Sequence, residues 1–183
     1  MSLPDLRYAN NIVKAFGFIG EEEARLIFDL AVRACRTDAV FVNIGAGVGT
    51  SSLAMRAGCP QSIIYTVDIC TGGPLGGLEN ERNVFGPTPL KLPNQILGDS
   101  STIGKTWENE EIDFIFIDGD HTEEGLTKDI EAWFPHMKNG GIMGYHDYGH
   151  HFWPCVKLIV DRFMDSFTIL GHERFTIAFE VSK

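Results

Sequence analysis

The segment Val40–Ser52 constrains the fold of this chain more than any other part of it. A short apolar run, Val40–Ile44, ends in three glycines at alternate positions, Gly45, Gly47 and Gly49, and a helix-compatible stretch follows. Glycine permits positive φ angles and the close approach of a ligand to the main chain. The start of a helix offers unpaired N–H groups to a polar ligand. The pattern therefore predicts a strand, a tight turn and a helix start that together bind a nucleotide-like molecule.

Apolar runs and helical patterns alternate along the rest of the chain. The runs predict five strands and a last antiparallel pair, at residues 40–44, 62–67, 94–97, 112–117, 142–145, 167–170 and 175–181. Helical spacing predicts helices at 51–57, 126–137 and 154–163, one that begins at residue 21, and a helical turn at 78–84. Such alternation is typical of a Rossmann-like, doubly wound α/β fold with a mostly parallel seven-stranded sheet and a C-terminal antiparallel pair. We expect one domain over 1–183, with a helical N-terminal segment at 1–37 and the core at 38–183.

The charge and cysteine content restrict the partners and the compartment. Fifteen basic and twenty-five acidic side chains give a net charge of −10, which argues against a nucleic-acid partner. No apolar run reaches the ~18 residues of a membrane span, and the N-terminus lacks the pattern of a secretory signal. Four cysteines are scattered without a C-x-x-C pair. We therefore expect a cytoplasmic protein, bound to no membrane, with reduced thiols.

Polar residues gather where the predicted strands end, which is where ligands bind in parallel sheets. Asp68 closes the second strand, 19 residues after Gly49, and its carboxylate can accept both hydroxyls of a ribose. Asp99 and Ser100 follow the third strand, and either meet an adenine edge or cap a helix. These positions favour an adenosine-type ligand.

The spacing of the glycines separates two kinds of adenosine ligand. A dinucleotide fingerprint needs G-x-G-x-x-G, whereas this turn reads G-x-G-x-G and continues with Thr50. The chain also lacks a Tyr-x-x-x-Lys pair. A nicotinamide-dependent oxidoreductase is therefore kept only as an alternative.

Two further blocks indicate a family. The first is Phe116–His121, which contains Asp-Gly-Asp-His, and the second is Ile142–Tyr148, which contains His-Asp-Tyr. Together with the glycine turn, they resemble the class I S-adenosylmethionine-dependent methyltransferases. Within that class the chain is similar to macrocin-type sugar O-methyltransferases and to cephalosporin-hydroxylase-like proteins. The resemblance covers roughly residues 41–156.

The resemblance implies a set of site residues. It assigns the methionine part of S-adenosylmethionine to the turn and its strand, at Asn43, Gly45, Ala46, Gly47, Gly49 and Thr50. It assigns the ribose to Asp68 and the adenine to Asp99 and Ser100, and it counts Asp118 among the cofactor-binding residues. Mg²⁺ or another divalent cation would lie on Asp118, His146 and Asp147, and His121 would be the general base beside Asp118.

Two positions depart from the family pattern. Asn43 stands where many methyltransferases have an acid, so it can accept a hydrogen bond but supplies no charge. His146 stands where some metal-dependent members have a carboxylate. Mg²⁺ prefers oxygen ligands, so the metal site is weaker, takes a different metal, or is absent.

The predicted function is O-methylation of a small hydroxylated acceptor, with a homo-oligomer as a candidate assembly and the loop at 71–93 as a candidate lid. Alternatives stay open: a cofactor-binding module without catalysis, or a metal-centred hydrolase that uses His150 and His151. His121 could also merely precede a helix capped by Asp120. The aromatic residues Trp133, Phe134, Phe152 and Trp153 are expected to pack, and the last two are the best candidates for substrate contact.

Overall fold

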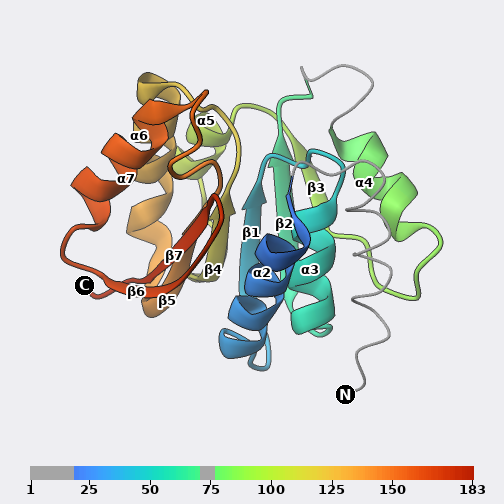
Figure 1. The fold of residues 1–183 in the computed structure, drawn as a ribbon. Coiled ribbons are helices and arrows are strands. Elements are labelled where there is room, and N and C mark those ends of the chain that lie inside the picture. Colours follow the sequence, from blue (N-terminus) through green and yellow to red (C-terminus); the bar gives the residue numbers. More distant parts are fainter. Residues whose placement is uncertain (1–18, 71–76) are drawn as a thin grey trace.

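The computed structural model describes residues 19–70 and 77–183, and its centre is a seven-stranded sheet in the order β3-β2-β1-β4-β5-β7-β6 (Figure 1). The strands are β1 (Val40–Ile44), β2 (Ile63–Asp68), β3 (Asn94–Leu97), β4 (Ile112–Ile117), β5 (Met137–Tyr145), β6 (Thr168–Glu173) and β7 (Thr176–Glu180). The helices are α2 (Glu21–Arg33), α3 (Thr50–Gly58), α4 (Leu78–Phe85), α5 (Ser100–Lys105), α6 (Glu123–Trp133), α7 (Pro154–Met164) and a 3₁₀ turn, η2 (Phe134–His136). The predicted fold class is confirmed, with β6 and β7 as the antiparallel pair.

The helices form two layers because each strand of the sheet centre is apolar on both faces. In β1 the side chains of Val40, Val42 and Ile44 belong to the core cluster that includes residues of α6 and α7. Phe41 belongs to a second cluster with residues of α2 and α3. Successive side chains of a strand point to opposite faces, so the two clusters lie on opposite sides of the sheet. Among the described residues, no helix has the length and apolarity needed to cross a membrane.

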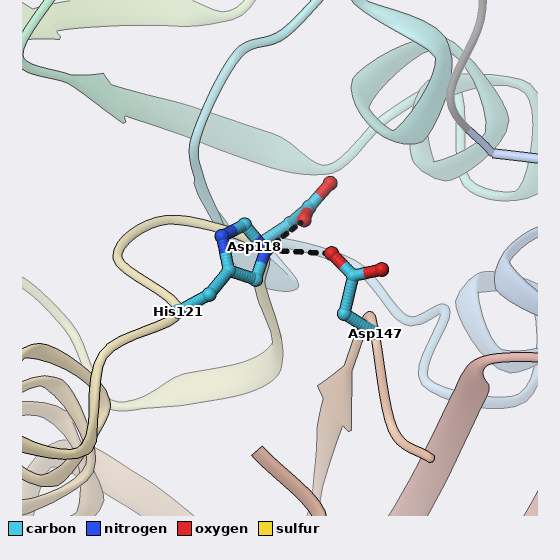
Figure 2. Close-up of side chains that lie close together, drawn as sticks. All are labelled: Asp118, His121 and Asp147. Carbon is cyan, nitrogen blue, oxygen red and sulfur yellow. Dashed lines mark hydrogen bonds and ion pairs between the residues drawn. The ribbon is translucent and has the colours of Figure 1, made fainter. Parts of the chain in front are cut away.

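The order of the strands determines which strand ends meet at the candidate functional edge of the sheet. β1 pairs in parallel with both β2 and β4, so the chain winds in two directions from β1. Asp118 donates its N–H to the carbonyl of Ile44 at 2.9 Å, and His146 donates to the carbonyl of Ile117 at 3.1 Å. The carboxyl ends of β1, β4 and β5 therefore meet at the switch point, where ligands bind in such sheets. Side chains that follow β4 and β5 come together there (Figure 2).

Two predicted boundaries were wrong for local reasons. The helix predicted to reach residue 137 ends at Trp133 and continues as η2, after which Met137 begins β5. Pro135 has no N–H and cannot continue the α-helical hydrogen bonding. Between Ile112 and Phe114 of β4, the pairing with β5 is irregular, and Gly140 takes a φ of +79° there. The strand predicted for 142–145 is thus the second half of a longer one.

The last hairpin is tighter than predicted. The expected turn at residues 171–174 is mostly strand, because β6 extends to Glu173 and the reversal falls at Arg174, whose φ is +52°. Gly171 serves packing instead of the turn. A Cβ on Gly171 would lie 2.5 Å from Leu26 Cδ1 of α2. The predicted helical turn at 78–84 is confirmed as α4, while residues 71–76 of the candidate lid and 1–18 of the N-terminal segment lie outside the described residues.

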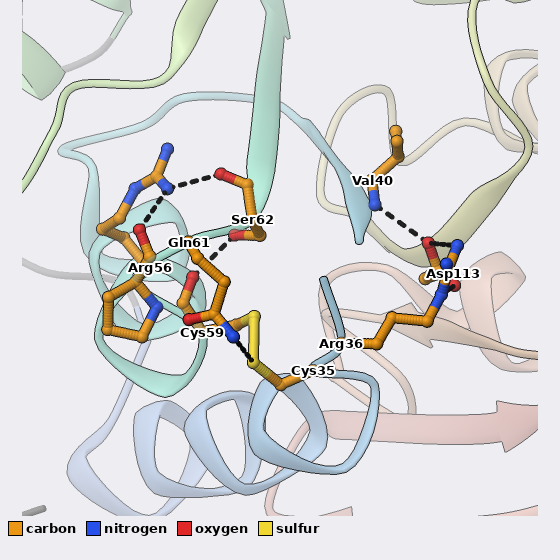
Figure 3. The surroundings of a disulfide bond; sticks show 9 residues. Cys35, Arg36, Val40, Arg56, Cys59, Gln61, Ser62 and Asp113 are labelled. Carbon is orange, nitrogen blue, oxygen red and sulfur yellow. Dashed lines mark hydrogen bonds and ion pairs between the residues drawn. A yellow bond between two sulfur atoms is a disulfide. The ribbon is translucent and has the colours of Figure 1, made fainter. Parts of the chain in front are cut away.

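The prediction of reduced cysteines was wrong for one pair. Cys35, which follows α2, is bonded to Cys59, which follows α3, with 5.3 Å between their Cα atoms (Figure 3). Cys70 and Cys155 are free. Cysteine spacing in a sequence does not reveal such a pair, because the two helix ends meet only when α2 packs on α3. Reduced thiols were one reason to expect a cytoplasmic location, and this reason does not hold for Cys35 and Cys59.

We expect reduction of the Cys35–Cys59 bond to lower stability substantially. The bond closes a loop with a sequence separation of 24, and a cross-link of that size stabilises by about 3 kcal/mol, chiefly by restricting the unfolded chain. Thermal unfolding with and without a reductant should then differ by about 6–12 °C for a domain of this size. A Cys70→Ser/Cys155→Ser variant, which keeps the bond, should show the same difference. Equal melting temperatures with and without reductant would contradict this expectation.

Candidate active site

The glycine turn leads from β1 into α3 with three left-handed residues. Gly45, Gly47 and Gly49 have φ angles of +83°, +49° and +89°, so each position favours glycine. A Cβ on Gly45 would lie 2.1 Å from the carbonyl oxygen of Asp118, so the turn touches the end of β4. A Cβ on Gly47 would have no described atom within 4 Å. The turn is thus packed against protein at its start and open at its middle.

The carboxylate of Asp68 lies against the same turn. Its Oδ2 accepts the N–H of Ala46 at 2.7 Å, and its Oδ1 accepts the N–H of Cys70. An ionised carboxylate has about four acceptor sites, so Asp68 keeps capacity for further donors such as hydroxyls. The structure therefore places the carboxylate of Asp68 in contact with the glycine turn.

Asn43 lies beneath the turn, fully buried. Its Nδ2 donates to the carbonyl of Gly45 at 3.0 Å and to Ser52 Oγ at 2.9 Å. Among the described residues its Oδ1 has no hydrogen-bond partner, and neither has the hydroxyl of Thr50 at the start of α3. Buried polar atoms are rarely left unpaired, so these two atoms are candidates for ligand contact.

Asp99 and Ser100 border a polar cavity of about 500 Å³ between the starts of α5 and α6. Asp99 is the N-cap of α5, where it accepts the N–H of Thr102 at 2.8 Å. The Ser100 hydroxyl donates to the buried Asp129, another residue of the cavity lining. Burial raises the pKa of Asp129 to about 6, against the hydrogen bond from Ser100.

Sequence reasoning missed Asp129, although a signal was present. Asp129 falls on the apolar stripe of α6 with Leu126, Ile130 and Trp133, all buried. An acid at such a position is unusual, because a buried carboxylate needs a partner or a proton. Its position indicates a polar function for this part of the cavity wall.

Four side chains from two loops form a compact ionic cluster. Asp118 and His121 follow β4, and His146 and Asp147 follow β5. His121 Nε2 lies 2.7 Å from Asp147 Oδ2 and 3.3 Å from Asp118 Oδ1 (Figure 2). His146 Nδ1 lies 3.2 Å from Asp118 Oδ1 and 3.5 Å from Asp147 Oδ2. The residues predicted from the two strand-end blocks therefore meet at one place.

The charges of the cluster depend on one another. Burial opposes a charge on His121, but hydrogen bonds and charge from Asp118 and Asp147 outweigh it and raise its pKa to about 9. The same balance raises the pKa of His146 to about 12. Burial opposes ionisation of the two carboxyls, and the imidazoles outweigh it, so that the pKa values of Asp118 and Asp147 fall below their usual range. At neutral pH the cluster thus holds two carboxylates and two imidazolium ions.

Glu23 of α2 is a residue of this region that sequence reasoning missed. It is fully buried, its Oε1 lies 3.4 Å from His146 Nε2, and it accepts the N–H of Phe175 at 3.1 Å. In the sequence, Glu23 stands as the last of three consecutive acids at the start of a helix. Its spacing to Ile27 and Leu30, which are buried on the same stripe, was the available signal. Glu23 joins α2 to both the cluster and the last hairpin.

Two residues at the start of α7 contact His121. The indole of Trp153 stacks on the His121 ring, with 5.1 Å between centroids and 23° between planes. The Cys155 thiol donates to the His121 carbonyl at 2.9 Å. The N-cap of α6 is Thr122, so Asp120 is not the cap, although it accepts the N–H of Thr122. His121 is therefore more than a residue that precedes a helix.

A cation could be held by part of this cluster. Asp118, His121 and Asp147 offer ligand atoms that all lie within 4.8 Å of one another. In the described part of the chain this is the group that could hold a metal, and it includes neither His150 nor His151. Those two rings stack on each other instead, with 4.7 Å between centroids. The alternative of a metal site built on this histidine pair is not supported.

Comparison with known proteins gives one family and one fold. A family described as a methyltransferase domain matches residues 42–148. The structure of the O-methyltransferase NovP is 15% identical with a TM-score of 0.73, over 92% of this chain and 83% of that chain. MycE methyltransferase from the mycinamycin biosynthetic pathway, in complex with Mg and SAH, is 18% identical with a TM-score of 0.65, over 98% of this chain and 55% of that chain. An rRNA methylase from Streptococcus thermophilus is 14% identical with a TM-score of 0.64, over 86% and 95%.

Proposed function

The chain belongs to the methyltransferase-domain family, and on that premise we propose that it transfers the methyl group of S-adenosylmethionine to a hydroxyl of a small acceptor. One observation carries the proposal. The ring of His121 lies 2.7 Å from the carboxylate of Asp147, at the sheet edge where the glycine turn ends β1. The nicotinamide-dependent alternative is not kept, because the family is one of methyltransferases.

The residues around the turn fit this cofactor. No atom of the described residues would contact a Cβ on Gly47, so a ligand can approach the main chain there, and the carboxylate of Asp68 can accept ribose hydroxyls. The unpaired Asn43 Oδ1 can accept a hydrogen bond from an ammonium group. The polar cavity beside Asp99 and Ser100 has room for the adenine. We propose these residues, with Gly45, Ala46, Gly49, Thr50 and Asp118, as the cofactor site.

His121 is proposed as the general base. Methyl transfer from a sulfonium to a hydroxyl needs the donor carbon and the acceptor oxygen in line, and removal of the hydroxyl proton. Asp147 and Asp118 accept hydrogen bonds at His121 Nε2, which fixes the ring and stabilises the imidazolium that forms when the base takes a proton. Trp153 covers one face of the ring. The indole is 41% exposed, so it also offers apolar surface to an acceptor.

The donor set also fits a divalent cation. Two carboxylates and an imidazole form a mixed oxygen and nitrogen set, which suits transition metals as well as Mg²⁺. The two carboxylates, Asp118 and Asp147, would hold the cation, and it would supply Lewis acidity that lowers the pKa of the acceptor hydroxyl. The imidazole in reach of both carboxylates is that of His121, whereas His146, the predicted third ligand, is not part of this group among the described residues. With the carboxylate charge taken up, the pKa of His121 would fall toward 6.5 and the ring would lose its proton near neutral pH.

We expect Asp147→Asn to lower the pKa of His121 even in metal-free protein. Asparagine tolerates the left-handed backbone of this position, where φ is +57°, but removes one of the two charges that raise the imidazole pKa. The wild-type pKa of about 9 should fall to roughly 8 or below. The base form of His121 would then be present at lower pH, so the rise of the rate with pH would move to lower pH.

The measurement is the ring resonance of His121 in EDTA-treated protein, followed by NMR over pH and assigned by its loss in His121→Gln. Asp165→Asn, at the exposed end of α7, is the matched control and should leave this titration unchanged. A His121 titration that is the same in Asp147→Asn and in wild type would show that Asp147 does not stabilise the imidazolium.

Calorimetric titration with S-adenosylmethionine and S-adenosylhomocysteine tests the proposed function directly. We expect saturable binding, followed by S-adenosylhomocysteine formation when hydroxylated small molecules are supplied. No binding at millimolar cofactor would remove the proposal. Tight binding without turnover over a broad set of acceptors would instead favour the cofactor-binding module.

The acceptor is proposed to be a small molecule because the chain is acidic. An rRNA methylase shares the fold, but a net charge of −10 opposes a phosphate backbone. A cytoplasmic location and a homo-oligomer remain predictions.

A further inference from the structure

A buried chain of hydrogen bonds runs from the glycine turn to α4. Asn43 Nδ2 donates to Ser52 Oγ at 2.9 Å, and Ser52 Oγ lies 3.2 Å from Thr66 Oγ1. The Thr66 hydroxyl donates to Glu81 Oε1 at 2.8 Å. All four side chains are buried, and they come from β1, α3, β2 and α4. The chain thus begins under the proposed cofactor site and ends on a carboxylate.

We call this chain of hydrogen bonds the relay. At its Glu81 end, the donors and acceptors are fixed by neighbouring side chains. Gln95 Nε2 donates to Glu81 Oε2 at 2.8 Å and to the carbonyl of Leu78 at 2.7 Å. Arg82 donates to Gln95 Oε1 at 2.6 Å, so the amide of Gln95 cannot turn over without losing both contacts. Glu81 therefore accepts hydrogen bonds at each of its oxygens.

The hydrogen bonds of the relay also orient the amide of Asn43. Thr66 gives its one hydroxyl proton to Glu81, whose pKa burial raises against hydrogen bonds from Ser52, Gln95 and Thr66. The Ser52 hydroxyl is within hydrogen-bond reach of both Thr66 and Glu81, so its proton goes to one of these two acceptors. In either arrangement Ser52 Oγ accepts from Asn43, and the Asn43 amide is left with its Oδ1 free of partners among the described residues.

We propose that the Glu81–Thr66–Ser52 relay is a positioning device that holds the Asn43 amide with its carbonyl oxygen available to the α-ammonium group of the cofactor's amino-acid part. The inference rests on the proposed function, since it concerns the same cofactor. Glu81 touches no ligand itself; it acts through Asn43. The relay gives an uncharged side chain a fixed acceptor orientation at a position where the sequence supplies no acid.

The isosteric change Glu81→Gln shows why the carboxylate matters. The new NH₂ group must face either the fixed NH₂ of Gln95 or the hydroxyl of Thr66. In the second case Thr66 gives its proton to Ser52, and the Ser52 proton then faces the NH₂ of Asn43. Two donors cannot pair, so the Asn43 amide is disturbed although no atom of Asn43 has changed.

The probes are S-adenosylhomocysteine and its deamino analogue, which lacks only the α-amine, titrated into the full-length protein by calorimetry. In wild type, we expect the analogue to bind about tenfold more weakly, as loss of one hydrogen bond to a charged group requires. Glu81→Gln and Ser52→Ala should weaken S-adenosylhomocysteine by about tenfold and leave the analogue within about twofold. Glu79→Gln, an exposed acid of the same helix, should change neither.

Ser52→Ala separates the relay from the charge of Glu81, because it removes the oxygen that accepts from Asn43 and keeps the carboxylate. A loss in Glu81→Gln alone would mean a charge effect and would overturn the relay. An equal loss for both ligands would mean general distortion and would overturn it as well. If wild-type protein bound neither ligand, the proposed function would fail with it, whereas unchanged S-adenosylhomocysteine affinity in both variants would remove only the relay.

Discussion

Replacing His121 by glutamine should lower kcat for methyl transfer by about 10²–10⁴-fold, the range that loss of a general base produces. Glutamine preserves a polar side chain at this position but has no basic nitrogen. Binding of S-adenosylhomocysteine should change by no more than about twofold, because the base contacts the acceptor and not the cofactor. The measurement is single-turnover formation of S-adenosylhomocysteine, with the cofactor affinity determined separately.

His151→Gln is the matched control for this prediction. His151 is an exposed histidine of the loop between β5 and α7 and lies outside the group of possible metal ligands. It should leave both kcat and cofactor affinity unchanged. If His121→Gln retained most of the wild-type kcat, another group would have to remove the proton, and the role assigned to the carboxylate–imidazole cluster would be wrong.

Gly45→Ala should be among the most damaging single substitutions in this chain. The added Cβ would lie 2.1 Å from the carbonyl oxygen of Asp118, a main-chain atom that cannot move aside without breaking the contact between β1 and β4. A left-handed φ of +83° adds strain. We expect a loss of about 4 kcal/mol or more, at the upper limit for point substitutions. In thermal unfolding this is a drop of roughly 8–16 °C, or a failure to fold.

Gly47→Ala should behave differently because its Cβ would meet no atom of the described residues within 4 Å. The fold should lose only the ~1–2 kcal/mol of a left-handed alanine. Gly140→Ala is the matched control, since its φ of +79° is also left-handed and its Cβ would also meet nothing within 4 Å. Both variants should melt alike, but only Gly47→Ala should lose affinity for S-adenosylhomocysteine. Equal cofactor affinity in the two would show that the ligand does not approach the turn at Gly47.

Local pattern was sufficient for most of the fold. Strands β1 and β4 are fully buried, so both of their faces are apolar, and their runs of hydrophobic residues stand out in the sequence. The misplaced boundaries came where a single residue overrides the pattern. Pro135 ends α6 although the apolar spacing continues to Met137, and Gly171 serves contact with α2 instead of a turn. The disulfide could not be predicted, because Cys35 and Cys59 meet through the packing of two helices.

The sequence by itself determined the sheet, the glycine turn and the edge where Asp68, Asp118 and Asp147 gather, because strand ends and turns depend on residues that are near neighbours in the chain. Tertiary structure decided the partners and the charges. Glu23 and Glu81 reach the site region from helices whose sequence positions say nothing of that contact. The pKa of His121 is raised by carboxylates that belong to two different strand ends. Hydrogen bonds and ionic interactions act over a few ångströms in space, and only the packed chain brings these groups within that range.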